Sequence, residues 1–136
     1  MPKYKPHEPS EDKFLKGFDD FCIYTIKMLK DEEVCPKSAR WLGANEIIDI
    51  VQKMHTSVHR ANNIKVTYPK EKELRHSLQV NAYSLMTTLG EKFTFCTKVY
   101  DIKVNKLSNW LTTKGEIQSW LSSWTRSDEK RYADIL

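Results

Sequence analysis

The chain has 136 residues, of which 40% are hydrophobic and 29% are charged. This length suits one domain, and this composition is typical of a globular protein rather than a disordered chain. No segment reaches the ~18 apolar positions that a membrane span needs, and the polar N-terminus lacks the apolar core of a signal peptide. The three cysteines form no CxxC pair. We therefore expect a cytoplasmic protein with reduced thiols and no membrane association.

The charges are distributed unevenly, although the net charge is only +4. Residues 37–126 carry 14 basic and 7 acidic side chains, whereas residues 1–36 are net acidic. A basic body favours nucleic acid or an acidic protein as a partner. The alternative is that the lysines only keep a helical surface soluble.

Two helices are predicted after a flexible polar leader of residues 1–9. The first extends from Ser10 to about Asp31, and the second from Pro36 or Ser38 to Asn63. The apolar stripe of the first helix is Phe14, Phe18, Phe21, Thr25 and Met28. That of the second is Trp41, Ala44, Ile48, Val51, His55 and Val58, widened by Ile47 and Met54. Asn62-Asn63 suits a helix end because asparagine tolerates the left-handed cap conformation.

Two more helices are predicted in the remainder of the chain. The third extends from Pro69 to the region of Gly90, with a stripe formed by Leu74, Leu78, Ala82, Leu85, Leu89 and Phe93. The fourth begins near Thr97 or Lys98 and carries two stripes, over residues 100–111 and 117–124, about a third of a turn apart. We therefore expect a kink, a break or a change of neighbour near Gly115. Residues 125–136 are predicted to be a frayed polar tail.

Four amphipathic helices with short connections predict an all-α fold, namely an antiparallel four-helix bundle over residues 10–124. Catalysis has little support in this sequence. His55 and His59 share a helical face and could bind a metal, but the sequence has no HExxH pattern and clusters no further ligands beside them. No nucleophile motif, P-loop or dinucleotide fingerprint occurs either. We expect no catalytic residue, metal or cofactor, and a metal-dependent helical enzyme is the weakest alternative.

The basic residues gather in the second helix, the connector after it and the start of the third helix. Arg60, Lys65, Lys70 and Arg75 are expected to share one end of the bundle, where they could neutralise phosphates. The candidate polyanion- or partner-binding residues are Lys37, Arg40, Arg60, Lys65, Lys70, Lys72 and Arg75. The alternative is an ordinary solvated bundle end.

The fourth helix places lysines on or beside its apolar stripe. A wet channel or a surface between subunits would explain Lys103 and Lys114, and so would lysine stems that lie along the core with their charges in water. The candidate pore or oligomer-interface residues are Lys103, Lys106, Trp110, Lys114, Trp120 and Trp124. The tryptophans are expected to serve packing or an oligomer interface.

Four short features, in this order, resemble a known family. They are Cys35-Pro36-Lys37-Ser38, Arg60-Ala61-Asn62, the leucine-rich third helix, and a final helix that carries Tyr100 and closes on Leu121-Ser122-Ser123-Trp124. Over residues 18–124 they are similar to the accessory variability determinant proteins of diversity-generating retroelements. The chain departs from the family pattern at Ser122-Ser123, where a glycine pair is usual, and in a longer stretch between Tyr100 and Trp124.

This resemblance implies a four-helix bundle that assembles into a barrel-like homopentamer and is not itself an enzyme. It implies binding to the retroelement reverse transcriptase and to the template-repeat RNA, with the cDNA as a further candidate ligand. The complex would support mutagenic cDNA synthesis in a bacterial or phage-infected bacterial cell. Lys103 and Lys114 would then lie near an intersubunit channel. A related four-helix bundle encoded in ribosomal RNA intervening sequences, of unknown role, is the alternative.

Overall fold

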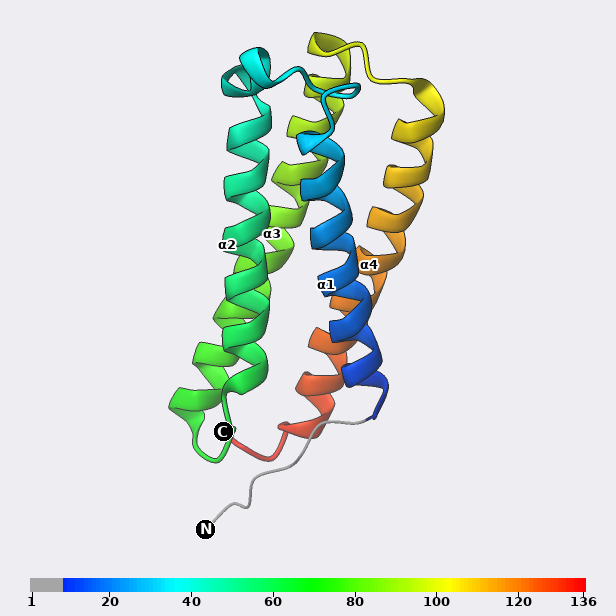
Figure 1. The fold of residues 1–136 in the computed structure, drawn as a ribbon. Coiled ribbons are helices and arrows are strands. Elements are labelled where there is room, and N and C mark those ends of the chain that lie inside the picture. The colour runs from blue at the N-terminus through cyan, green and yellow to red at the C-terminus, as the bar shows by residue number, and fades with distance from the viewer. Residues whose placement is uncertain (1–8) are drawn as a thin grey trace.

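The computed structural model describes residues 9–136, apart from the side chains of residues 9–11, Trp41 and Val104. The described chain forms four long helices, α1 (Pro9–Lys30), α2 (Ala44–Asn63), α3 (Pro69–Val99) and α4 (Val104–Arg131), and a 3-10 helix, η1 (Lys37–Leu42). The four helices alternate in direction, and α1 and α3 each pack between α2 and α4 (Figure 1). The predicted all-α four-helix bundle is therefore confirmed. The predicted leader lies outside the described residues, except that Pro9 is the first residue of α1.

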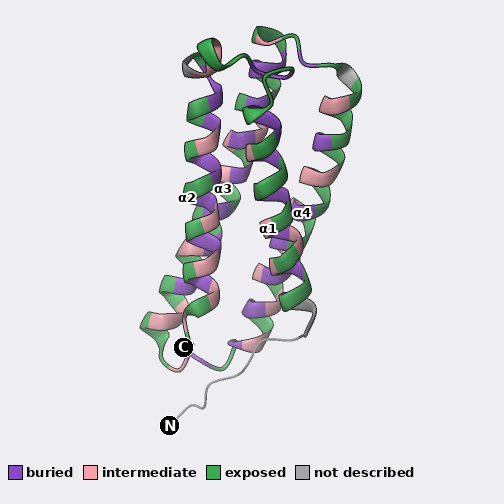
Figure 2. Cartoon of the chain, viewed as in Figure 1, coloured by how far each residue is buried: buried purple, intermediate pink, exposed green. Residues whose placement is uncertain are grey.

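Helix α1 follows the prediction closely. Every residue of its predicted stripe is buried, and the helix ends at Lys30, directly before Asp31. Two basic residues, Lys27 and Lys30, lie in its last turn, where positive charge interacts favourably with the helix dipole. Burial alternates with exposure along all four helices, which places one continuous core along the axis of the bundle (Figure 2).

Helix α2 ends at Asn63 as predicted, but for a different reason. The residue after it, Ile64, has φ −79°, so the chain leaves the helix through an extended conformation and without a left-handed cap. The buried stripe is centred on Ile47, Met54 and Ala61, whereas His55 of the predicted stripe is only half-buried. The predicted widening of the stripe by Ile47 and Met54 is confirmed, and α2 packs chiefly against α3.

Helix α3 begins at Pro69 as predicted, and its first turn is capped by Glu71. One oxygen of this side chain accepts hydrogen bonds from the backbone N–H groups of Thr67 and Tyr68, at 2.9 and 2.8 Å. The predicted end near Gly90 was wrong, because the helix continues to Val99. Gly90 instead provides close approach: a β-carbon there would lie 2.6 Å from Cε of Lys114 on α4.

Helix α4 begins at Val104, later than predicted, after a connector in which Asp101 has φ 52°. It is one continuous α-helix through Gly115, so the predicted break does not occur. Its buried positions form a single stripe that faces both α1 and α3: Trp110, Ile117, Leu121, Trp124 and Asp128. Leu111 belonged to the predicted stripe but is exposed, because the indole of Trp110 occupies the core at this level.

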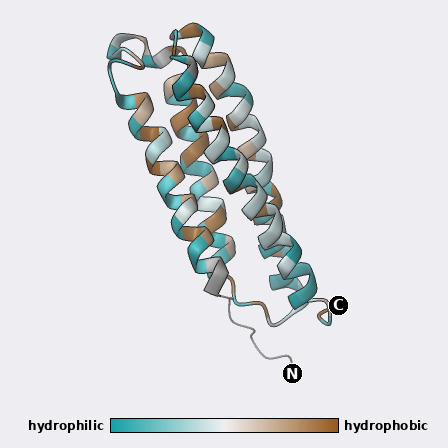
Figure 3. Cartoon of the chain, turned by 90° about the vertical axis from the view of Figure 1, so that its right-hand side faces the viewer, coloured by the Kyte–Doolittle hydropathy of each residue, from teal (hydrophilic) through white to brown (hydrophobic). Residues whose placement is uncertain are grey.

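The predicted polar tail was also wrong. Residues 125–131 continue α4, and two residues beyond its end, Tyr132 and Ile135, are buried against Val66 of the α2–α3 connector. The last turns of α4 are strongly hydrophilic (Figure 3), which is why hydropathy alone indicated a tail. A few apolar side chains and a buried ionic group attach this segment to the bundle.

The η1 end of the bundle is held by Tyr100. Its hydroxyl donates to the carbonyl of Ala39, at 2.8 Å, and accepts from the backbone N–H of Ala44, at 3.2 Å. Gly43 lies beside it, between η1 and α2, and a β-carbon at Gly43 would lie 2.6 Å from Sγ of the buried Cys96. Any larger residue at this position would therefore push α3 away from the η1–α2 junction.

Gly43→Ala is expected to lower the free energy of unfolding by about 1–3 kcal/mol, the usual range for overpacking a core. Gly115→Ala is the matched control, because no atom lies within 4 Å of a β-carbon there and the residue is inside a helix. Alanine should stabilise that site by up to about 1 kcal/mol. Urea unfolding followed by circular dichroism measures both, and equal effects at the two glycines would contradict the packing argument.

Candidate functional site

Three of the predicted basic residues lie exposed at one end of the bundle. Arg60 is in the last turn of α2, Lys65 is in the connector, and Lys70 is in the first turn of α3. The connector places these positions together at the end that also holds the C-terminus (Figure 1). We call Arg60, Lys65 and Lys70 the connector cations.

Lys72 lies near the connector cations, but its side chain also makes a hydrogen bond within the fold. Its Nζ donates to the carbonyl of Ile135, at 2.7 Å, and its side chain is half-buried. This bond holds the segment after α4 against the start of α3. Lys72 therefore contributes charge near this end of the bundle but also has a structural role.

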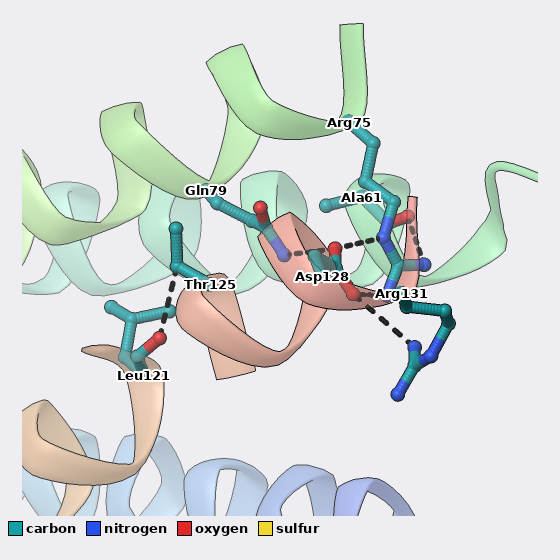
Figure 4. Close-up of polar contacts among 7 residues, drawn as sticks. All are labelled: Ala61, Arg75, Gln79, Leu121, Thr125, Asp128 and Arg131. Atoms are coloured by element: carbon teal, nitrogen blue, oxygen red, sulfur yellow. Dashed lines mark hydrogen bonds and ion pairs between the residues drawn. The ribbon is translucent and has the colours of Figure 1, made fainter. Parts of the chain in front are cut away.

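Arg75 was predicted to be a polyanion-binding residue, and that prediction is incompatible with its burial. Arg75 is 1% exposed and points into the bundle, between α3 and α4 (Figure 4). Its Nε and Nη2 donate to the two carboxylate oxygens of Asp128, at 2.5 and 3.0 Å, and its Nη1 donates to the carbonyl of Ala61, at 3.2 Å. The guanidinium also lies over the ring of Trp124, 5.1 Å from its centroid.

Asp128 is the centre of this buried network, which we call the Arg75–Asp128 network. Besides Arg75, it accepts hydrogen bonds from Nε2 of Gln79, at 2.7 Å, and from Nη1 of Arg131, at 3.2 Å (Figure 4). The network joins the end of α2, the start of α3 and the end of α4. Its charges partner one another, as buried charges must, so it serves the fold.

Lys37 and Arg40 lie at the other end of the bundle, on η1 (Figure 1). Arg40 is half-buried, and its Nη2 donates to the carbonyl of Lys30 at the end of α1. Lys37 is exposed. The structure therefore does not unite these two residues with the connector cations, because the length of α2 separates them.

The tryptophans of α4 divide between the core and the surface. Trp110 and Trp124 are buried within the single chain, which identifies them as packing residues and removes them from any pore or subunit interface. Trp120 is 40% exposed, with its ring against Gly17 and edge-on to Phe14 of α1. Of the three, Trp120 alone stays a candidate for contact with another molecule.

The lysines of α4 and its preceding connector also differ from one another. The stem of Lys114 lies over Gly90, and its Nζ donates to Oε1 of Gln118, at 2.9 Å. This arrangement agrees with the alternative in which the stem covers the core and the charge reaches the surface. Lys103 is exposed and Lys106 is half-buried.

Surface grooves lie on both sides of α3. A groove of about 470 Å³ between α2 and α3 has a mixed lining, in which Leu78 and Leu85 lie beside the polar Lys53, Arg60, Ser57 and Asn81. A second groove, of about 310 Å³, lies between α3 and α4. Its residues are Gln79, Val80, Tyr83, Ser84, Ser122 and Thr125. Val80 and Tyr83 are exposed, so the second groove presents apolar surface beside the small side chain of Ser122.

A cluster that could hold a metal lies between α1 and α2. Oδ1 of Asp19 is 3.0 Å from Nε2 of His55 and 2.7 Å from Nε2 of His59. The two histidines were predicted as a pair from their spacing, but the carboxylate was missed because Asp19 belongs to another helix. The i, i+4 spacing of the histidines and the position of Asp19 beside the buried Phe18 were the signals that could have suggested it.

In the part of the chain that the structure describes, none of the helices combines the length and the apolar character needed to cross a membrane. Comparisons with protein-family models, curated proteins and solved structures found no match to this chain.

Proposed function

We propose that the chain is a non-enzymatic accessory factor of a diversity-generating retroelement, which binds the reverse transcriptase and the template-repeat RNA to support mutagenic cDNA synthesis. The observation that carries the proposal is the group of connector cations at one end of a four-helix bundle. The resemblance of the motifs over residues 18–124 gives this basic surface its expected ligand. The cDNA, which carries the same backbone phosphates, is a further candidate.

The position of the connector cations suits a phosphate backbone. They belong to the end of α2, the connector and the start of α3. Their side chains therefore extend from three neighbouring backbone segments at one end of the bundle. Arg60 also lines the groove between α2 and α3, where Ser57 and Asn81 add polar groups and Lys53 forms an ion pair with Asp49. Contacts of this kind to phosphates position a nucleic acid and contribute most of the salt-sensitive part of its affinity.

The proposal includes assembly into a homopentamer. Support for a subunit contact comes from exposed apolar side chains along α3 and α4, namely Val80, Tyr83 and Trp120. In a ring, each subunit would use one surface against a different surface of its neighbour. Lys103, Lys106 and Lys114 would then lie near the inner channel.

The test is RNA binding by the full-length protein over a series of salt concentrations, on a sample whose mass is measured by light scattering. We expect a pentamer whose affinity for single-stranded template-repeat RNA falls steeply with salt. The triple variant R60E/K65E/K70E should bind weakly and reduce the slope of log K against log [salt] by about 2, which corresponds to three lost phosphate contacts on a single strand.

A second triple variant, K27E/K30E/K98E, is the matched control. It changes the net charge equally, but at exposed positions near the opposite end of the bundle. Equal losses of affinity in both variants would show that only the net charge matters and would overturn the assignment of the connector cations. The proposed function would be refuted if the parent protein were a monomer that does not bind RNA. It would also be refuted if immobilised reverse transcriptase did not bind the parent protein.

A further inference from the structure

We propose that Asp19, His55 and His59 form a binding site for a divalent transition-metal ion of the Zn²⁺ class. Three atoms define the site: Oδ1 of Asp19 and Nε2 of each histidine. Each of these atoms lies within 4.8 Å of the other two. Ligands of a tetrahedral zinc ion lie about 2.0–2.2 Å from the metal, so small side-chain rotations would bring all three within bonding distance. The ion would link α1 to α2 near the middle of the bundle.

The donor set favours a transition metal over Mg²⁺ or Ca²⁺. Imidazole nitrogen suits Zn²⁺, Co²⁺, Ni²⁺ and Cu²⁺, whereas Mg²⁺ and Ca²⁺ prefer oxygen ligands throughout. Two imidazoles and one carboxylate also match the protein ligands of many open zinc sites, in which a fourth position holds water or a substrate. A single carboxylate adds the negative charge that two neutral imidazoles lack.

The fold holds these side chains in place before any ion binds. His55 and His59 are one helical turn apart on α2, and their ring centroids are 4.4 Å apart. The ring of His55 also stacks on the buried Phe18, at 6.2 Å and 14°. Asp19 directly follows Phe18 on α1, so packing of the phenylalanine in the core fixes the backbone from which the carboxylate extends. Ligands held by packing in this way lose little conformational entropy on binding a metal.

The site is open on one side. A groove of about 500 Å³ lies between α1 and α2, and Asp19 and His55 form part of its wall. The groove gives an ion a route from the solvent and leaves space for a water molecule or a small anion as a further ligand. The side chains of His55, His59 and Asp19 are 46%, 34% and 37% exposed, so an ion can reach all three.

Cys22 also lines this groove but does not belong to the donor set. Burial, and to a smaller extent the charge of Asp19, raise the pKa of the Cys22 thiol to about 12. The site is assigned to two nitrogens and one oxygen because Asp19, His55 and His59 are the residues whose donor atoms lie within reach of one another. This assignment does not depend on the proposed role with reverse transcriptase and RNA.

The test is a titration of the metal-free, full-length protein with Co²⁺, followed by visible absorption, and with Zn²⁺, followed by calorimetry. We expect one Co²⁺ per chain with d–d bands of a four- or five-coordinate ion, and displacement of this ion by Zn²⁺. The single variants D19N, H55Q and H59Q should each lower the affinity by at least about tenfold, since even the loss of an outer partner of a metal ligand has an effect of 10–100-fold.

Two control variants separate this site from other sources of binding. H76Q removes an exposed histidine of α3 outside the cluster, and C22A removes the thiol from the groove; both should leave the titration unchanged. Circular dichroism of every variant without metal shows whether the fold is intact. The proposal is overturned if the parent protein gives no d–d bands. It is also overturned if binding persists in all three ligand variants, or if H76Q or C22A abolishes it.

Discussion

Replacing Asp128 by alanine is expected to lower the free energy of unfolding by about 3–5 kcal/mol, the range typical of breaking a buried ion pair. The carboxylate accepts four hydrogen bonds from three side chains, and its main partner, Arg75, is almost wholly buried. Without Asp128, a guanidinium that cannot reach water would lose its counter-charge. The neighbouring Gln79 amide would lose its acceptor as well.

The cause of this loss can be separated from general damage to α4. Glu129→Ala changes the next residue, which is exposed, and should alter stability by no more than about 0.5 kcal/mol. The double variant R75M/D128L removes both charges and should recover much of the loss, because well-packed apolar residues can replace a buried ion pair. Urea unfolding at one fixed protein concentration measures all three. A loss below about 1 kcal/mol for Asp128→Ala would contradict the network.

The four helices could be predicted from the sequence because each carries apolar residues at helical spacing. Helix α1 illustrates this best, since its whole predicted stripe is buried. The buried faces were predicted wrongly where the buried residues are polar. On α3 the buried stripe passes through Arg75 and Gln79, so counting apolar residues placed Leu74 inside, whereas it is exposed.

The prediction of a frayed tail at the end of α4 was wrong for the same reason. Asp128 lies in a strongly charged segment, and its burial depends on Arg75, which is 53 residues earlier in the chain. A pattern within one helix cannot show a partner on another. The connector cations could be predicted in part, because residues at a helix–connector–helix junction must lie near one another, but Arg75 could not be separated from them without its burial.

The candidate metal cluster shows which ligands can be predicted from residue spacing within one helix. His55 and His59 could be paired from their i, i+4 spacing, which is a property of one helix. Asp19 joins them only through the packing of α1 against α2. Its position directly after the buried Phe18 is a signal within its own segment, but that position does not show which residues of α2 it contacts. The binding to reverse transcriptase and RNA stays a prediction, because it concerns partners that a single folded chain does not contain.

Trp110→Ala is expected to lower the free energy of unfolding by about 3–5 kcal/mol, as much as Asp128→Ala. Trp110 is fully buried, and its ring stacks on Phe93 of α3 with centroids 3.9 Å apart and an interplanar angle of 8°. It also contacts Phe21 of α1, at 5.5 Å between centroids. Truncation would leave a large cavity where three helices meet. Trp120→Ala is the matched control on the same helix, and its partial exposure should limit the loss to about 1 kcal/mol.

The indole of Trp110 also makes a hydrogen bond that a double-mutant cycle can isolate. Its Nε1–H donates to Oγ1 of Thr25, at 2.8 Å, and this hydroxyl donates in turn to the carbonyl of Phe21, at 2.9 Å. Thr25→Val would leave the indole donor buried without an acceptor, with a loss of about 1–3 kcal/mol. In Trp110→Phe, which has no such donor, Thr25→Val should have an effect about 1 kcal/mol smaller. If the two mutations were additive, the stability of this region would come from ring packing alone. All variants must be compared at equal protein concentration, since assembly into an oligomer would make the apparent stability depend on it.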